Sequence, residues 1–183
     1  MEEQGKLNVT EDVTEAFAQE LLNEFPSASV EVRENKLGRK RVWIRVDRKE
    51  YKALMRHLRS LDPEAHYSIG IEQDMGDHLG FTSHLLLTWR GEALSVLVEV
   101  KAPKDDPRID DISEIFPIAL QFEREGMEMV GIDFEGAPDK RRLFLPEDFP
   151  EGIYPLRLDD KGVSEDMVKN AGHPYYLKGG SKR

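Results

Sequence analysis

The residues of this chain with the strongest potential for chemistry are three consecutive charges, Glu123, Arg124 and Glu125. Two carboxylates this close in sequence could act as general acid and base if a substrate lay beside them. The chain has no glycine-rich phosphate loop and no serine elbow motif to complete such a site. An enzyme that uses these carboxylates is therefore a rival hypothesis with little support from the rest of the sequence.

The same charges lie in a predicted helix, where successive side chains differ in direction by about 100°. They cannot all face solvent if Phe122 and Met129 point inward, and an unpaired buried ion is costly. Two arrangements remain open. One is a charged outer face with local pairs, such as Arg124 with Glu128, and the other is an ion network against the C-terminal region or another protein.

A second possible site is the loop that holds Asp74, Asp77 and His78, which on paper could bind a metal. The pattern is more typical of a solvated hairpin turn. A free-standing α+β domain that binds a small ligand or metal there is the main alternative function.

Composition excludes several classes of protein. The 183 residues contain no cysteine, which excludes thiolate metal sites and iron–sulfur ligation by this chain. A net charge of −10 argues against general binding of nucleic acid or anionic membranes, and the basic run at 38–41 fits a solvated turn. No apolar run approaches the roughly 18 residues of a membrane span, and the acidic N-terminus lacks the apolar core of a secretion signal.

Hydrophobic periodicity predicts the elements that must position these residues. They are a helix within 10–26, strands at 27–34 and 40–47, a helix at 48–62, and strands at 65–73, 81–90 and 93–101. Residues 102–111 are predicted to be a polar loop, followed by a turn at 111–116. Because proline is tolerated in the first turn, the last helix is predicted to begin at Pro117, and Gly131 marks its end.

This order favours an α+β fold: a two-layer sandwich in which helices cover one face of a mixed, mainly antiparallel sheet of about five strands. We predict an α+β domain at 1–136 and an extended, irregular C-terminal tail at 137–183. The first part carries 17 basic and 28 acidic residues, and the tail carries 9 and 8, which suggests different tasks.

The tail is rich in proline, with Pro138, Pro146, Pro150 and Pro155, yet it is too apolar for a solvated segment. A proline-broken segment cannot build a core, so its apolar side chains must be buried on the domain or on a partner. Large aromatic residues and arginines are the usual anchors of such contacts. The predicted partner-binding residues are Glu123, Arg124, Glu125, Arg141, Arg142, Phe144, Phe149, Tyr154, Leu156 and Arg157.

The stretch from Asp106 to Arg157 resembles the thirty-kilodalton subunit family of respiratory complex I and its counterparts in membrane-bound energy-converting hydrogenases. The matching residues are Asp106-Pro107, Ile115-Phe116-Pro117, Ala119, Glu123-Arg124-Glu125, Met129, Gly131-Ile132, Phe134, Gly136, Pro138-Asp139, Arg141-Arg142 and Pro155-Leu156-Arg157. Glu128, Ala137 and Asp111 depart from the family pattern, which favours an archaeal hydrogenase-type or related branch.

The resemblance implies a subunit without cofactor and without chemistry of its own, in the peripheral arm of an ion-translocating oxidoreductase complex. Its implied partners are the hydrogenase-like large subunit and an adjacent iron–sulfur subunit. The implied location is cytoplasmic, at the inner face of the membrane. The tail would then lie partly on its own domain and partly on the large subunit.

Overall fold

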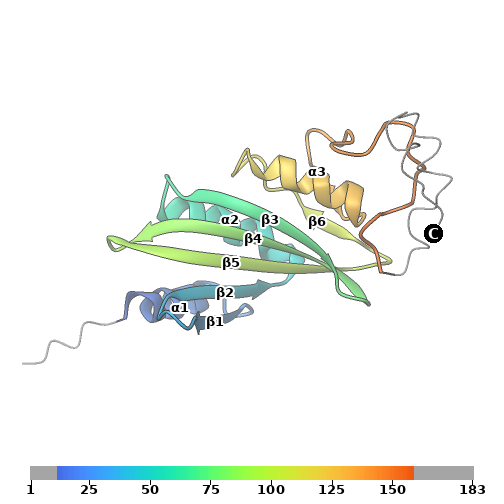
Figure 1. Cartoon of the computed structure of the whole chain (residues 1–183). Coiled ribbons are helices and arrows are strands. Elements are labelled where there is room, and N and C mark those ends of the chain that lie inside the picture. The colour runs from blue at the N-terminus through green and yellow to red at the C-terminus, as the bar shows by residue number, and fades with distance from the viewer. Residues whose placement is uncertain (1–11, 159–183) are drawn as a thin grey trace, which may run out of the picture.

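The computed structural model describes residues 12–158, and its main feature is a five-stranded sheet in the order β1-β2-β5-β4-β3 (Figure 1). Neighbouring strands pair antiparallel, except that β2 and β5 run parallel. The mixed, mainly antiparallel sheet predicted from sequence is confirmed. The strand bounds are β1 Ser29–Glu34, β2 Lys40–Val46, β3 His66–Asp74, β4 His78–Trp89 and β5 Glu92–Pro103.

Two of the predicted helices begin at aspartates. The side chain of Asp12 accepts a backbone N–H in the first turn of α1 (Val13–Glu24), and Asp47 does the same for α2 (Arg48–Leu61). Such caps satisfy backbone donors that have no partner within the helix. The apolar residues of both helices recur at helical spacing, so each helix presents one apolar stripe to the sheet.

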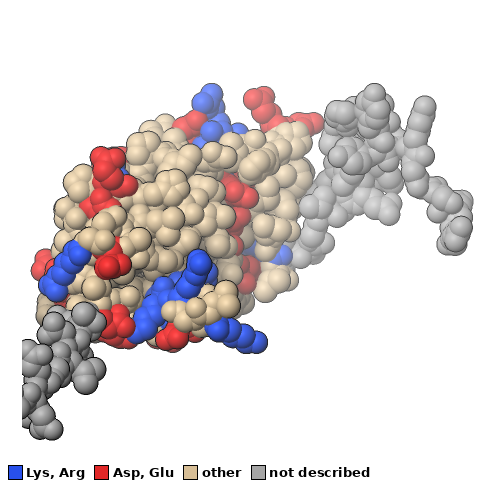
Figure 2. All heavy atoms as spheres, turned by 60° about the vertical axis from the view of Figure 1, so that its left-hand side comes forward, with Lys and Arg blue, Asp and Glu red and all other residues tan. Residues whose placement is uncertain are grey.

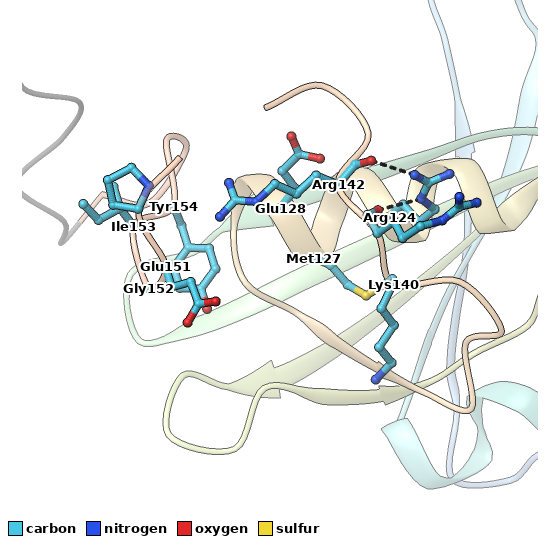
Figure 3. A pocket seen from close by; sticks show the side chains of 11 residues that line it. Arg124, Met127, Glu128, Lys140, Arg142, Glu151, Gly152, Ile153 and Tyr154 are labelled. Carbon is cyan, nitrogen blue, oxygen red and sulfur yellow. Dashed lines mark hydrogen bonds between the residues drawn. The ribbon is translucent and has the colours of Figure 1, made fainter. Parts of the chain in front are cut away.

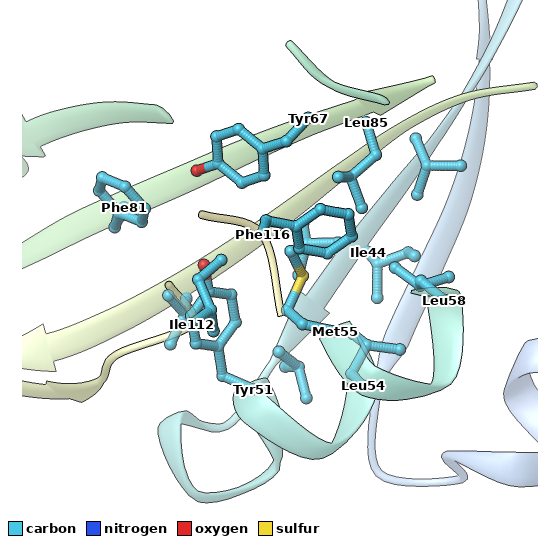
Figure 4. Close-up of a cluster of buried hydrophobic side chains, with 14 of the residues drawn as sticks. Ile44, Tyr51, Leu54, Met55, Leu58, Tyr67, Phe81, Leu85, Ile112 and Phe116 are labelled. Carbon is cyan, nitrogen blue, oxygen red and sulfur yellow. The ribbon is translucent and has the colours of Figure 1, made fainter. Parts of the chain in front are cut away.

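The core lies between these helices and the sheet, and Figure 4 shows its central part. Leu54, Met55 and Leu58 of α2 are fully buried there with Ile44 and Leu85 from the sheet.

A small polar cluster lies inside the same core. The hydroxyl groups of Tyr51 and Tyr67 lie 2.7 and 3.0 Å from the Ser83 hydroxyl, so these buried polar atoms have partners.

The region after β5 departs from the prediction. Residues 102–111 are not only a loop, because Arg108–Asp110 forms β6, which pairs in parallel with β7 (Asp133–Glu135). Helix α3 runs from Ala119 to Met129, so it begins two residues after Pro117. A three-residue strand has no periodicity of its own, and it forms here because a partner some 25 residues later lies beside it.

All three helices lie on one face of the sheet, as predicted. Helix α3 packs closely over β3 at Gly70, where an added β-carbon would lie 2.7 Å from the β-carbon of Phe122. The opposite face is not covered by any described helix and carries Ile69, Ile71 and Leu86. Figure 2 shows acidic and basic side chains interspersed over the visible surface. None of the helices within 12–158 has the length and apolar character needed to cross a membrane.

The predicted C-terminal tail is described only in its first half. Residues 137–158 contain no helix or strand, whereas the part of the tail prediction that concerns 159–183 lies outside the described residues.

Candidate partner interface

The most elaborate polar structure in the described residues joins α3 to residues 137–158, which we call the C-terminal segment. Glu128, near the end of α3, accepts hydrogen bonds from three successive backbone N–H groups. Leu143 N lies 2.6 Å and Phe144 N 3.0 Å from its oxygens, and Leu145 N is the third donor. A carboxylate that accepts several backbone donors makes strong, charge-assisted hydrogen bonds. One helical side chain thus holds the turn at 143–145.

Arg124 holds the preceding turn, one helical turn away on the same side of α3. Its Nε and Nη2 atoms donate to the carbonyls of Arg141 and Arg142 at 2.9 and 2.7 Å (Figure 3). Its Nη1 lies 3.5 Å from a carboxylate oxygen of Asp139. The expected local pair of Arg124 with Glu128 is therefore not what these side chains form. The second alternative, an ion network against the C-terminal region, describes them.

The segment returns to α3 at its far end. Leu156 N donates to the Met129 carbonyl at 3.0 Å, and Nε of Arg157 donates to the Val130 carbonyl at 2.7 Å. The guanidinium of Arg157 also lies over the Tyr154 ring, 4.4 Å from its centroid. These bonds use carbonyls at the helix C-terminus, which lack partners within the helix. The segment therefore caps α3.

The two predicted arginines of the segment, Arg141 and Arg142, differ in burial and in their partners. Arg142 is half-buried, donates to the Phe149 carbonyl at 2.6 Å and lies over the Phe149 ring. Arg141 is exposed and binds Asp139 through two hydrogen bonds of 2.9 and 2.7 Å, which hold the pKa of Asp139 well below its usual range. Arg142 is thus a structural residue of the segment, whereas Arg141 points outward.

Three apolar side chains of the segment remain open to solvent. Phe144 is 58% exposed, Leu156 is 55% exposed, and Leu158 is also exposed. Between α3 and the segment lies a hollow of about 360 Å³, lined by Arg124, Met127, Lys140, Glu151, Ile153 and Tyr154 among others (Figure 3). The backbone of the segment is thus hydrogen-bonded to the domain, while these three apolar side chains remain exposed.

Glu123 and Glu125, the paired carboxylates of the sequence, lie in separate environments. Glu123 is fully buried, its Oε1 accepts the backbone N–H of Ile112 at 2.9 Å, and its side chain is hydrogen-bonded to the Asp111 carboxyl. Burial, together with the neighbouring Asp111 carboxyl, raises the pKa of Glu123 to about 8. Glu125 is half-buried, and its charge adds to the effect of burial in raising the pKa of Glu72. No described feature joins the two glutamates into an acid–base pair.

The geometry of Asp74, Asp77 and His78 argues against the predicted metal site. The Asp74 side chain is almost fully buried and pairs with Lys104 at 2.8 Å, and it accepts the N–H of Leu158 at 2.9 Å. Asp77 is exposed and forms its side-chain hydrogen bond with the adjacent His78. Residues 12–158 contain no cluster of three potential metal ligands. Asp74 is instead an anchor for the end of the C-terminal segment.

The fold and this packing define an α+β protein whose last described segment is bound to α3 by an ion pair and by hydrogen bonds to its backbone. A family model described as respiratory-chain NADH dehydrogenase, 30 Kd subunit, matches residues 44–166. The chain belongs to this family, which confirms the resemblance found in its residues.

Individual relatives agree with this assignment. The membrane-bound hydrogenase subunit beta of Pyrococcus furiosus is 66% identical over 165 residues, which cover 90% of this chain and 95% of that protein. The NADH-quinone oxidoreductase subunit 5 of Thermus thermophilus is 40% identical over 72 residues, 39% of this chain and 34% of that one.

A solved structure shares the fold. A chain of the membrane-bound sulfane sulfur reductase, an archaeal respiratory membrane complex, superposes with a TM-score of 0.69 at 20% identity. The superposition covers 92% of this chain and 95% of that one.

Three features of this surface were not predicted from the sequence. Glu128 accepts hydrogen bonds from backbone N–H groups of the segment, Asp74 accepts the N–H of Leu158, and Gly131 leaves room for the Tyr154 ring. For Gly131 a signal existed, because a glycine directly after a helix commonly takes positive φ, and φ is +75° here. For Glu128 and Asp74 no local signal exists, since their partners lie 15 or more residues away.

Proposed function

We propose that this chain is a non-catalytic accessory subunit of a membrane-bound, ion-translocating oxidoreductase complex. In this proposal its C-terminal region binds the hydrogenase-like large subunit of the complex, beside an iron–sulfur subunit. The best support is the 66% identity to a membrane-bound hydrogenase subunit over nearly the full length of both chains. The oxidoreductase chemistry then belongs to other subunits.

The structure supports the C-terminal segment as the contact. Its backbone is bound by Glu128, Arg124 and Asp74, so it is already ordered before any partner arrives. Preorganised segments bind with a smaller entropic cost. Phe144 and Leu156 are exposed, as anchors for a partner should be.

The proposed location of the chain in the cell follows from its membership in a membrane-bound complex. We propose that the chain lies at the cytoplasmic face and reaches the membrane only through its neighbours. The lack of a spanning helix in the described residues is compatible with this arrangement.

The decisive experiment changes only the outward side chains. Phe144→Glu and Leu156→Glu are introduced together into the full chain, which is produced with an affinity tag in cells that make the complex. Because both side chains are exposed, the variant should fold with an unchanged melting temperature. We expect at least a tenfold loss of co-purified large subunit.

Leu37→Glu is the matched control, because Leu37 is an apolar residue that is 83% exposed in the β1–β2 turn. It should leave co-purification intact. Full recovery of the large subunit with the double variant would overturn the assignment of this surface.

A further inference from the structure

A second surface lies at the opposite end of the molecule, near the start of β2 and β5. A hollow of about 660 Å³ opens there on the side of the uncovered sheet face, and we call it the notch. Its lining includes Arg39 and Arg41 of the β1–β2 hairpin, His84 and Leu86 of β4, Ser95 of β5, and Asp12. No part of the C-terminal segment is among its lining residues, so the notch is separate from the candidate partner interface.

The notch exists because the parallel pairing of β2 with β5 does not extend to the first residues of β5. This pairing begins at Val42 of β2 opposite Val96 of β5, so residues 92–95 pair with β4 but not with β2. One edge of this short stretch therefore has no strand partner within the described residues. Backbone N–H and C=O groups along such an edge are available to another extended segment.

Charge in the notch is unbalanced. Lys40 pairs with Asp12 and Glu15. In contrast, the exposed side chains of Arg39 and Arg41 have no carboxylate partner in the part of the chain that the structure describes. Next to them, Leu86 is 45% exposed. A suitable occupant is therefore an extended segment with both carboxylates and apolar side chains.

The chain itself has such a segment. Residues 1–11, "MEEQGKLNVTE", carry three acidic residues, Glu2, Glu3 and Glu11, and one basic residue, Lys6, together with the apolar Leu7 and Val9. The segment joins the described structure at Asp12, which already lines the notch. Since an extended residue spans at most about 3.6 Å, Leu7 can reach roughly 18 Å from Asp12.

We infer that residues 1–11 bind in the notch, with acidic side chains on Arg39 and Arg41 and with Leu7 on Leu86. This inference does not depend on the proposed assembly function, because it concerns contacts within one chain and can be tested on the purified protein. A partner protein is the competing occupant of the notch.

Because the natural chain has no cysteine, disulfide trapping can report the contact without background. Leu7→Cys and Leu86→Cys are combined in the full chain and exposed to mild oxidation. We expect the intramolecular disulfide to form at least tenfold faster than in a control that pairs Leu7→Cys with Ile71→Cys. Ile71 controls for exposure, because it lies on the same sheet face at similar exposure, but at the β3 edge. Leu86 also shares the notch with Asp12, so a specific contact is distinguished from simple proximity by charge variants in which the attachment at Asp12 is unchanged.

Charge provides a second readout. Adding Arg39→Glu and Arg41→Glu to the protein with Leu7→Cys and Leu86→Cys should slow cross-linking at least fivefold. High salt should slow cross-linking in the protein that keeps both arginines, because exposed charges are screened. Equal rates of disulfide formation for the Leu86 and Ile71 pairs would overturn the inference, and a partner protein would then be the occupant of the notch to test. The melting temperatures of the reduced variants confirm that each one folds.

Discussion

The ring of Tyr154 lies directly against the backbone of Gly131. A β-carbon added to Gly131 would be 2.5 Å from Cζ of the ring, closer than real β-carbons come to other atoms. Gly131 follows the helix with φ +75°, and Tyr154 belongs to the C-terminal segment. The segment can therefore close over α3 only because residue 131 has no side chain. This contact connects the end of a helix to the proposed docking surface.

The first prediction concerns Gly131→Ala. The substitution adds backbone strain of about 1 kcal/mol or more at positive φ and also displaces the Tyr154 ring. We expect faster amide exchange and faster proteolysis in residues 150–158, with a smaller effect on the sheet. Gly91→Ala is the control, since Gly91 has φ +82° but no atom within 4 Å of an added β-carbon. Equal exchange at residues 150–158 in both variants would show that the contact of Gly131 with Tyr154 does not hold the segment.

The second prediction concerns Glu128→Gln. The amide keeps one acceptor oxygen and places an NH₂ group against backbone donors, so charge-assisted hydrogen bonds are lost. We expect the free energy of unfolding to fall by about 1–3 kcal/mol and amide protection to decrease at residues 143–145. Glu125→Gln, in the same helix, should leave both quantities nearly unchanged. Retained protection at 143–145 in the Glu128 variant would contradict the assigned role.

The third prediction is a dependence of stability on pH. Burial and the Asp111 carboxyl raise the pKa of Glu123 from 4.5 to about 8 in the folded protein, so the folded state keeps a proton that the unfolded state releases. Stability therefore decreases as pH rises through the window between these two pKa values and levels off above the folded pKa. At about 1.4 kcal/mol per pKa unit, the full decrease is on the order of 5 kcal/mol.

Glu123→Gln tests this dependence, because the amide resembles the protonated acid and can still accept the Ile112 N–H. Urea unfolding followed across this window should give a flatter profile for the variant. Asp111 does not mask the effect, since its lowered pKa keeps it ionised in both states over this range. Parallel profiles for the two proteins would disprove the protonated state of Glu123.

The fourth prediction concerns the contact of α3 with the sheet. A β-carbon at Gly70 would lie 2.5 Å from the Phe81 ring and 2.7 Å from the Phe122 β-carbon. Overpacking of this kind costs about 1–3 kcal/mol, so Gly70→Ala should lower the midpoint of urea unfolding. Gly80→Ala is the control, because its nearest neighbour is the flexible Met75 side chain at 3.6 Å. An unchanged midpoint for Gly70→Ala would show that α3 can shift without cost.

Local patterns in the sequence were sufficient for much of the fold. Asp47 and the apolar stripe around Leu54 predict α2, and the alternation of Val42, Ile44 and Val46 predicts β2. These signals work because a helix or strand that covers a core must repeat its apolar residues with its own period. The charge triplet around Arg124 also indicated, from helical geometry alone, that at least one charge would lie at a buried surface.

Tertiary structure decided which groups those charges meet. Glu123 became a buried acid beside Asp111, while Arg124 became a donor and Glu128 an acceptor to backbone groups of the C-terminal segment. Likewise, β6 formed only where β7 lies beside it. Each of these contacts joins residues distant in sequence, and no local periodicity encodes them. Periodicity records only which side of an element is buried, whereas the identity of the neighbour depends on how the whole chain closes around its core.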